Sequence, residues 1–167
     1  MLTYVLVIVA VAAMLYLSFR TLGGGAPVAA EDYRTVLRRL REFTAARAAE
    51  LSDALELAAS TPRAAAGADP LVAAATGARK KLTGYQEQLA RLEPDATGEE
   101  RDLLESARAL LSAGIEDLGW ACRMVEAGNH GDNPGVQRAV AELRAAAGEC
   151  VEAAGRLLGE EAGAPIA

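Results

Sequence analysis

The sequence TGEERDLLESARALLSAGIEDLGWACRMVEA, residues 97–127, has the pattern of a long amphipathic helix. Thr97 and Glu100 are spaced as a capping box, in which each side chain accepts a hydrogen bond from the other residue's backbone N–H, and they predict the helix start. Such a helix needs other elements to cover its apolar side. The apolar residues recur at steps of three and four, which places them on one side: Leu104, Ala107, Leu111, Gly114, Leu118, Ala121 and Val125.

Three other stretches have the same periodicity, and it predicts helices over about residues 30–59, 69–92 and 133–159. Asp69-Pro70 and Asn133-Pro134 each mark a helix start, because Asp or Asn can cap backbone N–H groups and proline has no N–H to lose. The expected core positions are Tyr33, Val36, Leu37, Leu40, Phe43, Ala48, Leu51, Leu55 and Ala58 in the first, Leu71, Ala75, Ala78, Leu82, Tyr85, Leu89 and Leu92 in the second, and Val136, Val140, Leu143, Ala147, Cys150, Ala154 and Leu157 in the third.

Four such helices predict an all-α fold, an antiparallel four-helix bundle. Only two Phe and one Trp are present, so the core must be built mainly from Leu, Val and Ala. No strand is expected, because alternating apolar patterns and clusters of β-branched residues are absent outside the first nineteen residues.

The first nineteen residues, MLTYVLVIVAVAAMLYLSF, contain no charged side chain. As a helix this segment is roughly 28 Å long, just enough to cross the hydrocarbon core of a bilayer. We therefore predict a single transmembrane anchor over residues 1–20, a Gly/Pro linker over 21–29, the bundle over 30–159 and a disordered tail over 160–167.

The basic residues predict the orientation of this anchor. No Lys or Arg precedes the apolar run, whereas Arg20 follows it and four arginines lie within residues 34–41. Basic residues favour the cytoplasmic side, so we expect a single-pass protein of the cell membrane with its N-terminus outside and its bundle in the cytoplasm. The alternative is an exported bundle, because residues 26–30, APVAA, have the small side chains of a cleavage site.

Composition and motifs argue against several functional classes. A net charge of −6 without a basic stripe argues against nucleic-acid binding. No nucleophile paired with a base, Glu-x-x-His motif or glycine-rich phosphate loop is present, so we expect neither an enzyme nor a cofactor. His130 is the only histidine and offers too few ligands for a structural zinc. We interpret its loop as turn chemistry, with a weak divalent-metal or pH-sensing role as the alternative.

The two cysteines, Cys122 and Cys150, fall at or beside the apolar stripes of their helices. In an antiparallel hairpin that turns near Gly131, Cys122 lies level with about residue 140, and Cys150 is offset by about 15 Å. A disulfide requires Cα atoms within about 7 Å. The sequence therefore predicts two separate reduced thiols, as in a cytoplasmic protein.

Trp120 falls outside the apolar seam of its helix, and Met124 lies one turn further on. An exposed Trp with a nearby Met is typical of partner-binding surfaces, because a large rigid ring provides contact area at low entropic cost. Trp120 and Met124 are therefore candidate partner-binding residues. The alternative is that the apolar stripe is wider and Trp120 covers a groove between helices.

Arg34, Arg38 and Arg41 share one helix face just beyond the linker, since they are separated by four and three residues. Such a cluster can lie against anionic lipid, at about 1 kcal/mol for each side chain near the surface. The alternative is that these arginines only set the topology and keep the helix soluble.

Together these features predict a membrane-anchored, non-enzymatic scaffold or adaptor. Its bundle is expected to bind a protein partner, or a second copy of itself, at the membrane, where tethering raises the effective concentration of both. The alternative is an exported sensory or ligand-binding helical bundle, against which the absence of a second apolar segment in the sequence counts.

Overall fold

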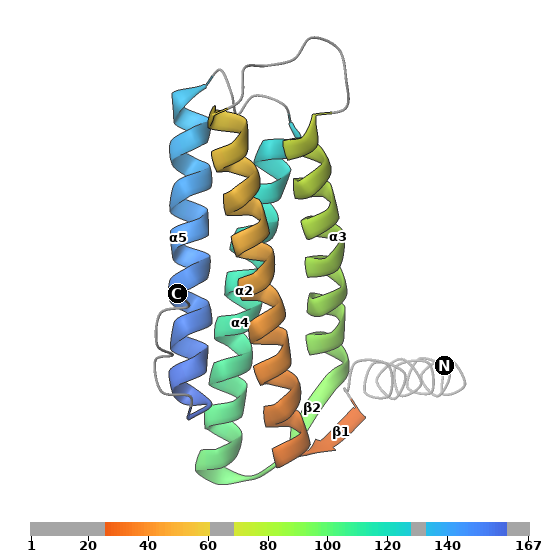
Figure 1. Ribbon diagram of the computed structural model, residues 1–167. Coiled ribbons are helices and arrows are strands. Elements are labelled where there is room, and N and C mark those ends of the chain that lie inside the picture. Colours follow the sequence, from red (N-terminus) through yellow and green to blue (C-terminus); the bar gives the residue numbers. More distant parts are fainter. Residues whose placement is uncertain (1–25, 61–68, 128–132, 160–167) are drawn as a thin grey trace, which may run out of the picture.

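The computed structural model describes residues 26–60, 69–127 and 133–159. In chain order the elements are β1 (Ala26–Ala29), α2 (Ala30–Ser60), α3 (Pro70–Arg91), β2 (Leu92–Asp95), α4 (Gly98–Glu126) and α5 (Pro134–Leu157). The helices run alternately in opposite directions and pack side by side (Figure 1). The predicted helical bundle is confirmed, and the helix bounds differ from the expected ones by at most two residues.

Two of the three predicted helix starts have the expected chemistry. The Asp69 side chain accepts a hydrogen bond from the Leu71 N–H at 2.9 Å, and the Asn133 side chain accepts from the Gly135 N–H at 2.9 Å. The capping box of α4 was wrong: Thr97 occupies the N-cap position but makes no side-chain cap. Gly98, at φ +60°, leads into α4 through the left-handed region of backbone conformation. The chain therefore enters the helix with a different backbone conformation from the one in which a capping box forms.

The expectation that the folded domain has no strand was also wrong. β1 pairs in parallel with β2, in the register Ala26 with Leu92 through Ala29 with Asp95. Residues 26–29 are therefore a strand rather than part of a flexible linker. Each strand contains a proline, and a proline in the sequence favours the prediction of a linker over that of a strand. Among the described residues the sheet has two strands, so each has a free edge on which a missing N–H has little cost.

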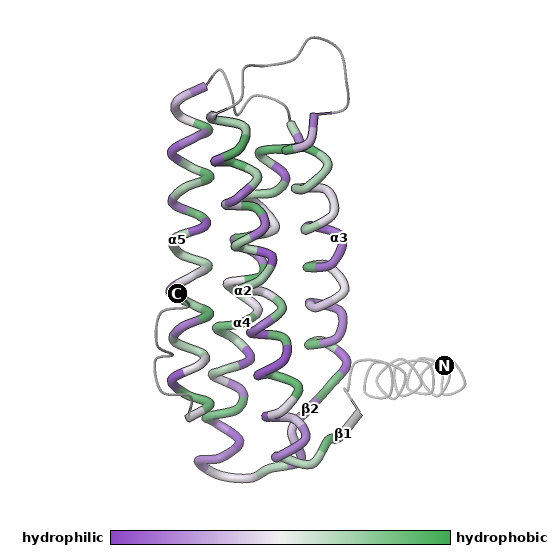
Figure 2. The backbone as a smooth tube through the Cα atoms, in the orientation of Figure 1, coloured by the Kyte–Doolittle hydropathy of each residue, from purple (hydrophilic) through white to green (hydrophobic). Residues whose placement is uncertain are grey.

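The core follows the predicted stripes most closely in α3 and α4. Hydrophobic and hydrophilic residues follow one another along every turn of each helix (Figure 2). All seven expected core residues of α4 are buried. In α2 the stripe was partly wrong. Phe43 is 49% exposed, and Thr44 is fully buried in its place, with its hydroxyl donating to the Leu40 carbonyl at 2.7 Å. Ala58 is exposed as well.

In α5 Val140, Ala147 and Ala154 are buried as expected, and Val136 and Leu143 are half-buried against the core. The other two expected positions were wrong by one residue: Val151 is buried rather than Cys150, and Leu158 is buried rather than Leu157, which is 36% exposed. The buried positions 147, 151, 154 and 158 retain the steps of four and three, so the apolar face is centred slightly to one side of the predicted stripe.

α4 and α5 form the most extensive helix pair. A Cβ built on Gly114 would lie 3.1 Å from the Ala147 carbonyl oxygen and 3.2 Å from the Cβ of Cys150. Cys150 therefore lies level with Gly114, about two turns of α4 from Cys122. Both cysteines are free, in agreement with the predicted register.

Within residues 26–60, 69–127 and 133–159 no helix is long and apolar enough to cross a bilayer. The predicted anchor over 1–20, the start of the linker at 21–25, His130 and the tail over 160–167 lie outside the described residues.

Candidate functional site

A groove runs along the outside of the bundle between α3 and α4. Its floor includes the buried side chains of Leu82 and Ile115. Gly119 leaves the groove open at one point, because a Cβ built there would have no neighbour within 4 Å. The lining residues are Arg79, Leu82, Thr83 and Gln86 from α3, and Ile115, Glu116, Gly119, Trp120 and Arg123 from α4.

Trp120 lies at the edge of this groove and is 49% exposed. Its helical position explains this exposure: Leu118 and Ala121 face the core, which turns the indole toward the outside. The guanidinium carbon of Arg123 lies 4.6 Å from the centroid of the indole ring, so the cation stacks on one face of the ring. Trp120 is thus partly ordered by its own helix and presents its remaining surface to solvent.

Met124, the other residue predicted for partner binding, is not part of the groove lining. It is half-buried and packs against the hydrophobic core. Of the two residues, Trp120 thus lines the groove and Met124 does not, and the ring contact of Trp120 is with Arg123. The three-residue spacing of Trp120 and Arg123 is a sequence signal that could have revealed this pair.

An ion pair fixes the wall of the groove where α3 meets the end of α4. The Nε atom of Arg79 donates to both carboxylate oxygens of Glu126, each at 2.9 Å. Cys122 lies close to this pair and is fully buried. Burial, together with the nearby Glu126 carboxylate, raises the pKa of Cys122 to about 11. The thiol is therefore protonated at neutral pH and is a poor nucleophile.

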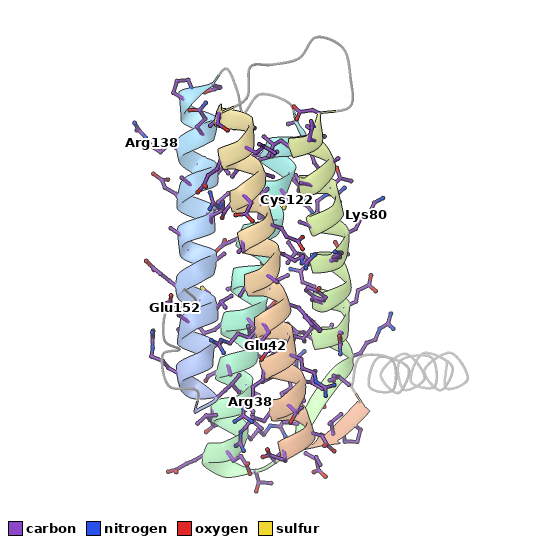
Figure 3. All side chains as sticks on the ribbon, viewed as in Figure 1. Arg38, Glu42, Lys80, Cys122, Arg138 and Glu152 are labelled. Atoms are coloured by element: carbon purple, nitrogen blue, oxygen red, sulfur yellow. The ribbon has the colours of Figure 1, made fainter. Side chains whose placement is uncertain are left out.

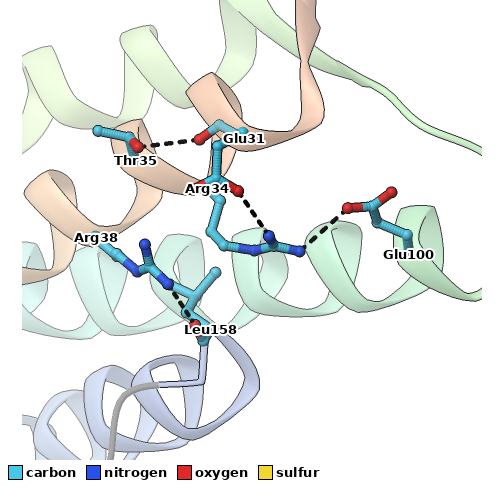
Figure 4. Close-up of polar contacts among 6 residues, drawn as sticks. All are labelled: Glu31, Arg34, Thr35, Arg38, Glu100 and Leu158. Atoms are coloured by element: carbon cyan, nitrogen blue, oxygen red, sulfur yellow. Dashed lines mark hydrogen bonds and ion pairs between the residues drawn. The ribbon is translucent and has the colours of Figure 1, made fainter.

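The arginines predicted to face lipid make contacts within the bundle. Arg34 pairs with Glu31 at 2.9 Å and with Glu100 of α4 at 3.2 Å. Arg38 donates to the Leu158 carbonyl, just past the end of α5, at 3.0 Å (Figure 4). These bonds join α2 to α4 and α5. Contact of these side chains with lipid stays a prediction.

Arg41 also contacts α5. A Cβ built on Gly155 would lie 2.7 Å from the Nε atom of Arg41, so the arginine side chain lies directly on the backbone of that glycine. Gly155 is consequently buried although it has no side chain.

Polar groups continue along the contact between α2 and α5. Arg144 donates to the Ser52 hydroxyl across this contact. Within the described residues, the buried Nε–H of Arg144 has no acceptor. An unpaired buried donor of this kind costs free energy in the folded state.

A second, more open hollow lies between α2 and α3. It is lined by Val36, Arg39, Leu40, Glu42, Phe43 and Gln88. Phe43 stacks on Tyr85 with ring centroids 5.9 Å apart and an interplanar angle of 27°. The exposed Phe43 is therefore already partnered on one face within the bundle.

Within the part of the chain that the structure describes, no group of three or more His, Cys, Asp or Glu side chains is arranged to hold a metal ion.

Comparison with known proteins finds no family model, no curated protein and no solved structure that matches this chain.

Proposed function

We propose that this protein is a membrane-anchored adaptor whose helical bundle binds a protein partner in the groove between α3 and α4. The exposure of Trp120 beside that groove carries the proposal. A half-exposed indole next to a concave surface is the arrangement from which binding hot spots are built, because a partner side chain can fill the hollow and cover the ring together.

The apolar segment over residues 1–19 supports the membrane part of the proposal. In this arrangement the N-terminus is outside and the bundle is in the cytoplasm, as the arginines that follow the segment favour. The anchor then restricts the groove to a thin layer beside the membrane, where a partner bound to the same membrane is met at high effective concentration.

Paired C-terminal reporters, one active only in the cytoplasm and one active only outside, test the membrane part. We expect signal from the cytoplasmic reporter alone. Signal from the external reporter alone would remove the cytoplasmic adaptor and favour an exported sensory or ligand-binding bundle. Signal from a fusion that stays in the soluble fraction would contradict the proposed membrane anchor.

Site-specific photo-crosslinking in cells tests the groove. A photo-reactive amino acid at Thr83, which is exposed and lines the groove, is expected to form a discrete protein adduct. The same amino acid at Arg138, exposed on α5, is the matched control and is expected to form none. Trp120→Ala should abolish the Thr83 adduct while thermal unfolding stays unchanged, because half of the indole is already in water. Equal adducts at both positions would contradict a groove-specific partner.

A further inference from the structure

The helix that forms one wall of the groove is basic in an otherwise acidic protein. α3 contains Arg79, Lys80, Lys81 and Arg91 but only one acidic residue, Glu87, whereas the whole chain has a net charge of −6. α3 therefore has a net positive charge, opposite in sign to the net charge of the whole chain. It creates a patch of positive potential, which attracts acidic groups.

Two of these four cations are already neutralised. Arg79 is paired with Glu126, and Arg91 lies 3.6 Å from Glu87. Lys80 and Lys81 are exposed and form no ion pair with any carboxylate that the structure describes. Lys80 points away from the bundle on the outer side of α3 (Figure 3).

The positive charge extends across the groove onto α4. Arg123 is exposed, stacks on Trp120 and also forms no ion pair with a described carboxylate. On α3, Lys80 directly follows the lining residue Arg79 and lies at the outer rim of the groove rather than in its lining (Figure 3). Among the lining residues, Glu116 is the acidic one. The groove thus has an apolar floor, an indole at its edge, Arg123 in its lining and Lys80 at its outer rim, and neither cation has a carboxylate partner among the described residues.

We propose that the partner segment bound in this groove is acidic and amphipathic, with an apolar anchor beside Trp120 and carboxylates facing Lys80 and Arg123. This inference rests on the proposed function and specifies the chemistry of its partner. A segment of this kind fills the hollow with its apolar residues and pairs its carboxylates with cations that have no carboxylate partner within the described bundle. A nucleic acid fits less well, because the acidic residues in the first turns of α4, outside the groove, would repel a polyanion longer than the groove, whereas a short segment does not reach them.

The test uses the full chain in detergent micelles and two synthetic helical peptides without Trp. Both peptides carry leucines at positions i, i+3, i+4 and i+7. One has glutamates at its flanking positions, and the other has lysines at the same positions. Dye anisotropy on the peptide measures binding, and the emission of Trp120, the single tryptophan of the chain, reports whether binding occurs at the groove.

We expect the glutamate peptide to bind and to shift Trp120 emission, and to bind at least about tenfold more tightly than the lysine peptide. Lys80→Glu and Arg123→Glu should each weaken this binding by about three- to tenfold, and added salt should weaken it further. Arg138→Glu is the matched control, because Arg138 lies on α5 on the opposite side of the bundle (Figure 3), and it should leave binding unchanged.

Three results of the peptide experiment would overturn the acidic partner: equal binding of the two peptides, equal weakening by Arg138→Glu, or tighter binding of a single-stranded oligonucleotide than of the glutamate peptide. The crosslinking experiment distinguishes this failure from failure of the adaptor. In the first case the Thr83 adduct is lost in Trp120→Ala but retained in Lys80→Glu and Arg123→Glu. That result would support the adaptor proposal and contradict the acidic partner. An adduct between two copies of the chain would assign the groove to self-association and also remove the acidic partner. Absence of any Thr83 adduct removes the adaptor itself.

Discussion

Tyr33 has the largest side chain that the described core buries completely, and its hydroxyl makes no hydrogen bond of normal geometry there, although the Arg108 guanidinium lies nearby. Burial raises the pKa of Tyr33, although the nearby Arg108 acts in the opposite direction. A polar group that is desolvated without a partner costs free energy in the folded state.

Tyr33→Phe is therefore expected to raise the free energy of unfolding by about 1 kcal/mol, since it removes the unpaired hydroxyl and retains the ring. Urea unfolding of the two proteins measures the difference. Tyr85→Phe is the matched control and should change little, because Tyr85 is only half-buried. A loss of stability in Tyr33→Phe would show that the hydroxyl has a bonding partner in solution.

Cys122 makes stability depend on pH in the alkaline range. Its pKa is about 11 in the folded protein, against an ordinary value of 9.0 for a thiol. Above pH 9 the unfolded chain loses this proton while the folded protein keeps it, so the folded state binds more protons and stability falls with rising pH. The contribution is fully present below pH 9 and is lost as the pH approaches 11.

We expect the stability difference between the wild type and Cys122→Ala to be constant from pH 7 to 8.5 and to shrink between pH 9 and 11. Urea unfolding at a series of pH values measures this difference. Cys150→Ala serves as a comparison, because Cys150 is less buried. A difference that stays constant up to pH 11 would contradict the raised pKa of Cys122.

At the scale of the elements, the contact between α4 and α5 depends on small residues. Gly114 on α4 faces the backbone of Ala147 on α5 at a distance that leaves little space for a side chain. The helices approach closely along this line, which lets them bury much of each other's surface.

Gly114→Val should lower the free energy of unfolding by about 1–3 kcal/mol, because the added carbons would collide with the Ala147 carbonyl and Cys150. Thermal unfolding followed by circular dichroism measures the loss. Gly77→Ala on α3 is the control: a Cβ at Gly77 meets no atom within 4 Å, and we expect that substitution to stabilise the protein by up to about 1 kcal/mol. Stabilisation by Gly114→Val would show that α4 and α5 are farther apart in solution.

At the scale of the whole molecule, the pairing of β1 with β2 determines how the N-terminal segment joins the bundle. Five residues, 21–25, separate the proposed anchor from β1, and they span at most about 18 Å. Because β1 is hydrogen-bonded to β2, the tether meets the bundle at the end where α3 leads into α4. In the proposed arrangement this end of the bundle lies next to the membrane.

Val28→Asp tests whether this ribbon contributes to the fold. Val28 is partly buried against the core, and we expect its replacement by Asp to lower the free energy of unfolding by about 1–2 kcal/mol. Ala29→Asp is the matched control, since Ala29 is exposed on the same strand. Urea unfolding of both variants measures the effect, and equal stability of the two would show that β1 adds little to the folded domain.

The helices of this protein were determined by local sequence, and the sequence alone predicted them. Apolar residues at steps of three and four, with Asp69-Pro70 and Asn133-Pro134 as starts, predicted the helix bounds to within two residues and seven of the nine buried residues of α4. These signals act within one or two turns of chain, so no knowledge of distant residues was needed.

The tertiary structure alone decided which surfaces meet. The choice between Phe43 and Thr44 in the core depended on the position of α2 against its neighbours, although Phe is the more apolar residue. The pairing of residues 26–29 with 92–95, and the groove that places Arg79 near Trp120, join segments far apart in the chain. Such contacts depend on the packing of whole helices, which the periodicity of a single helix does not specify.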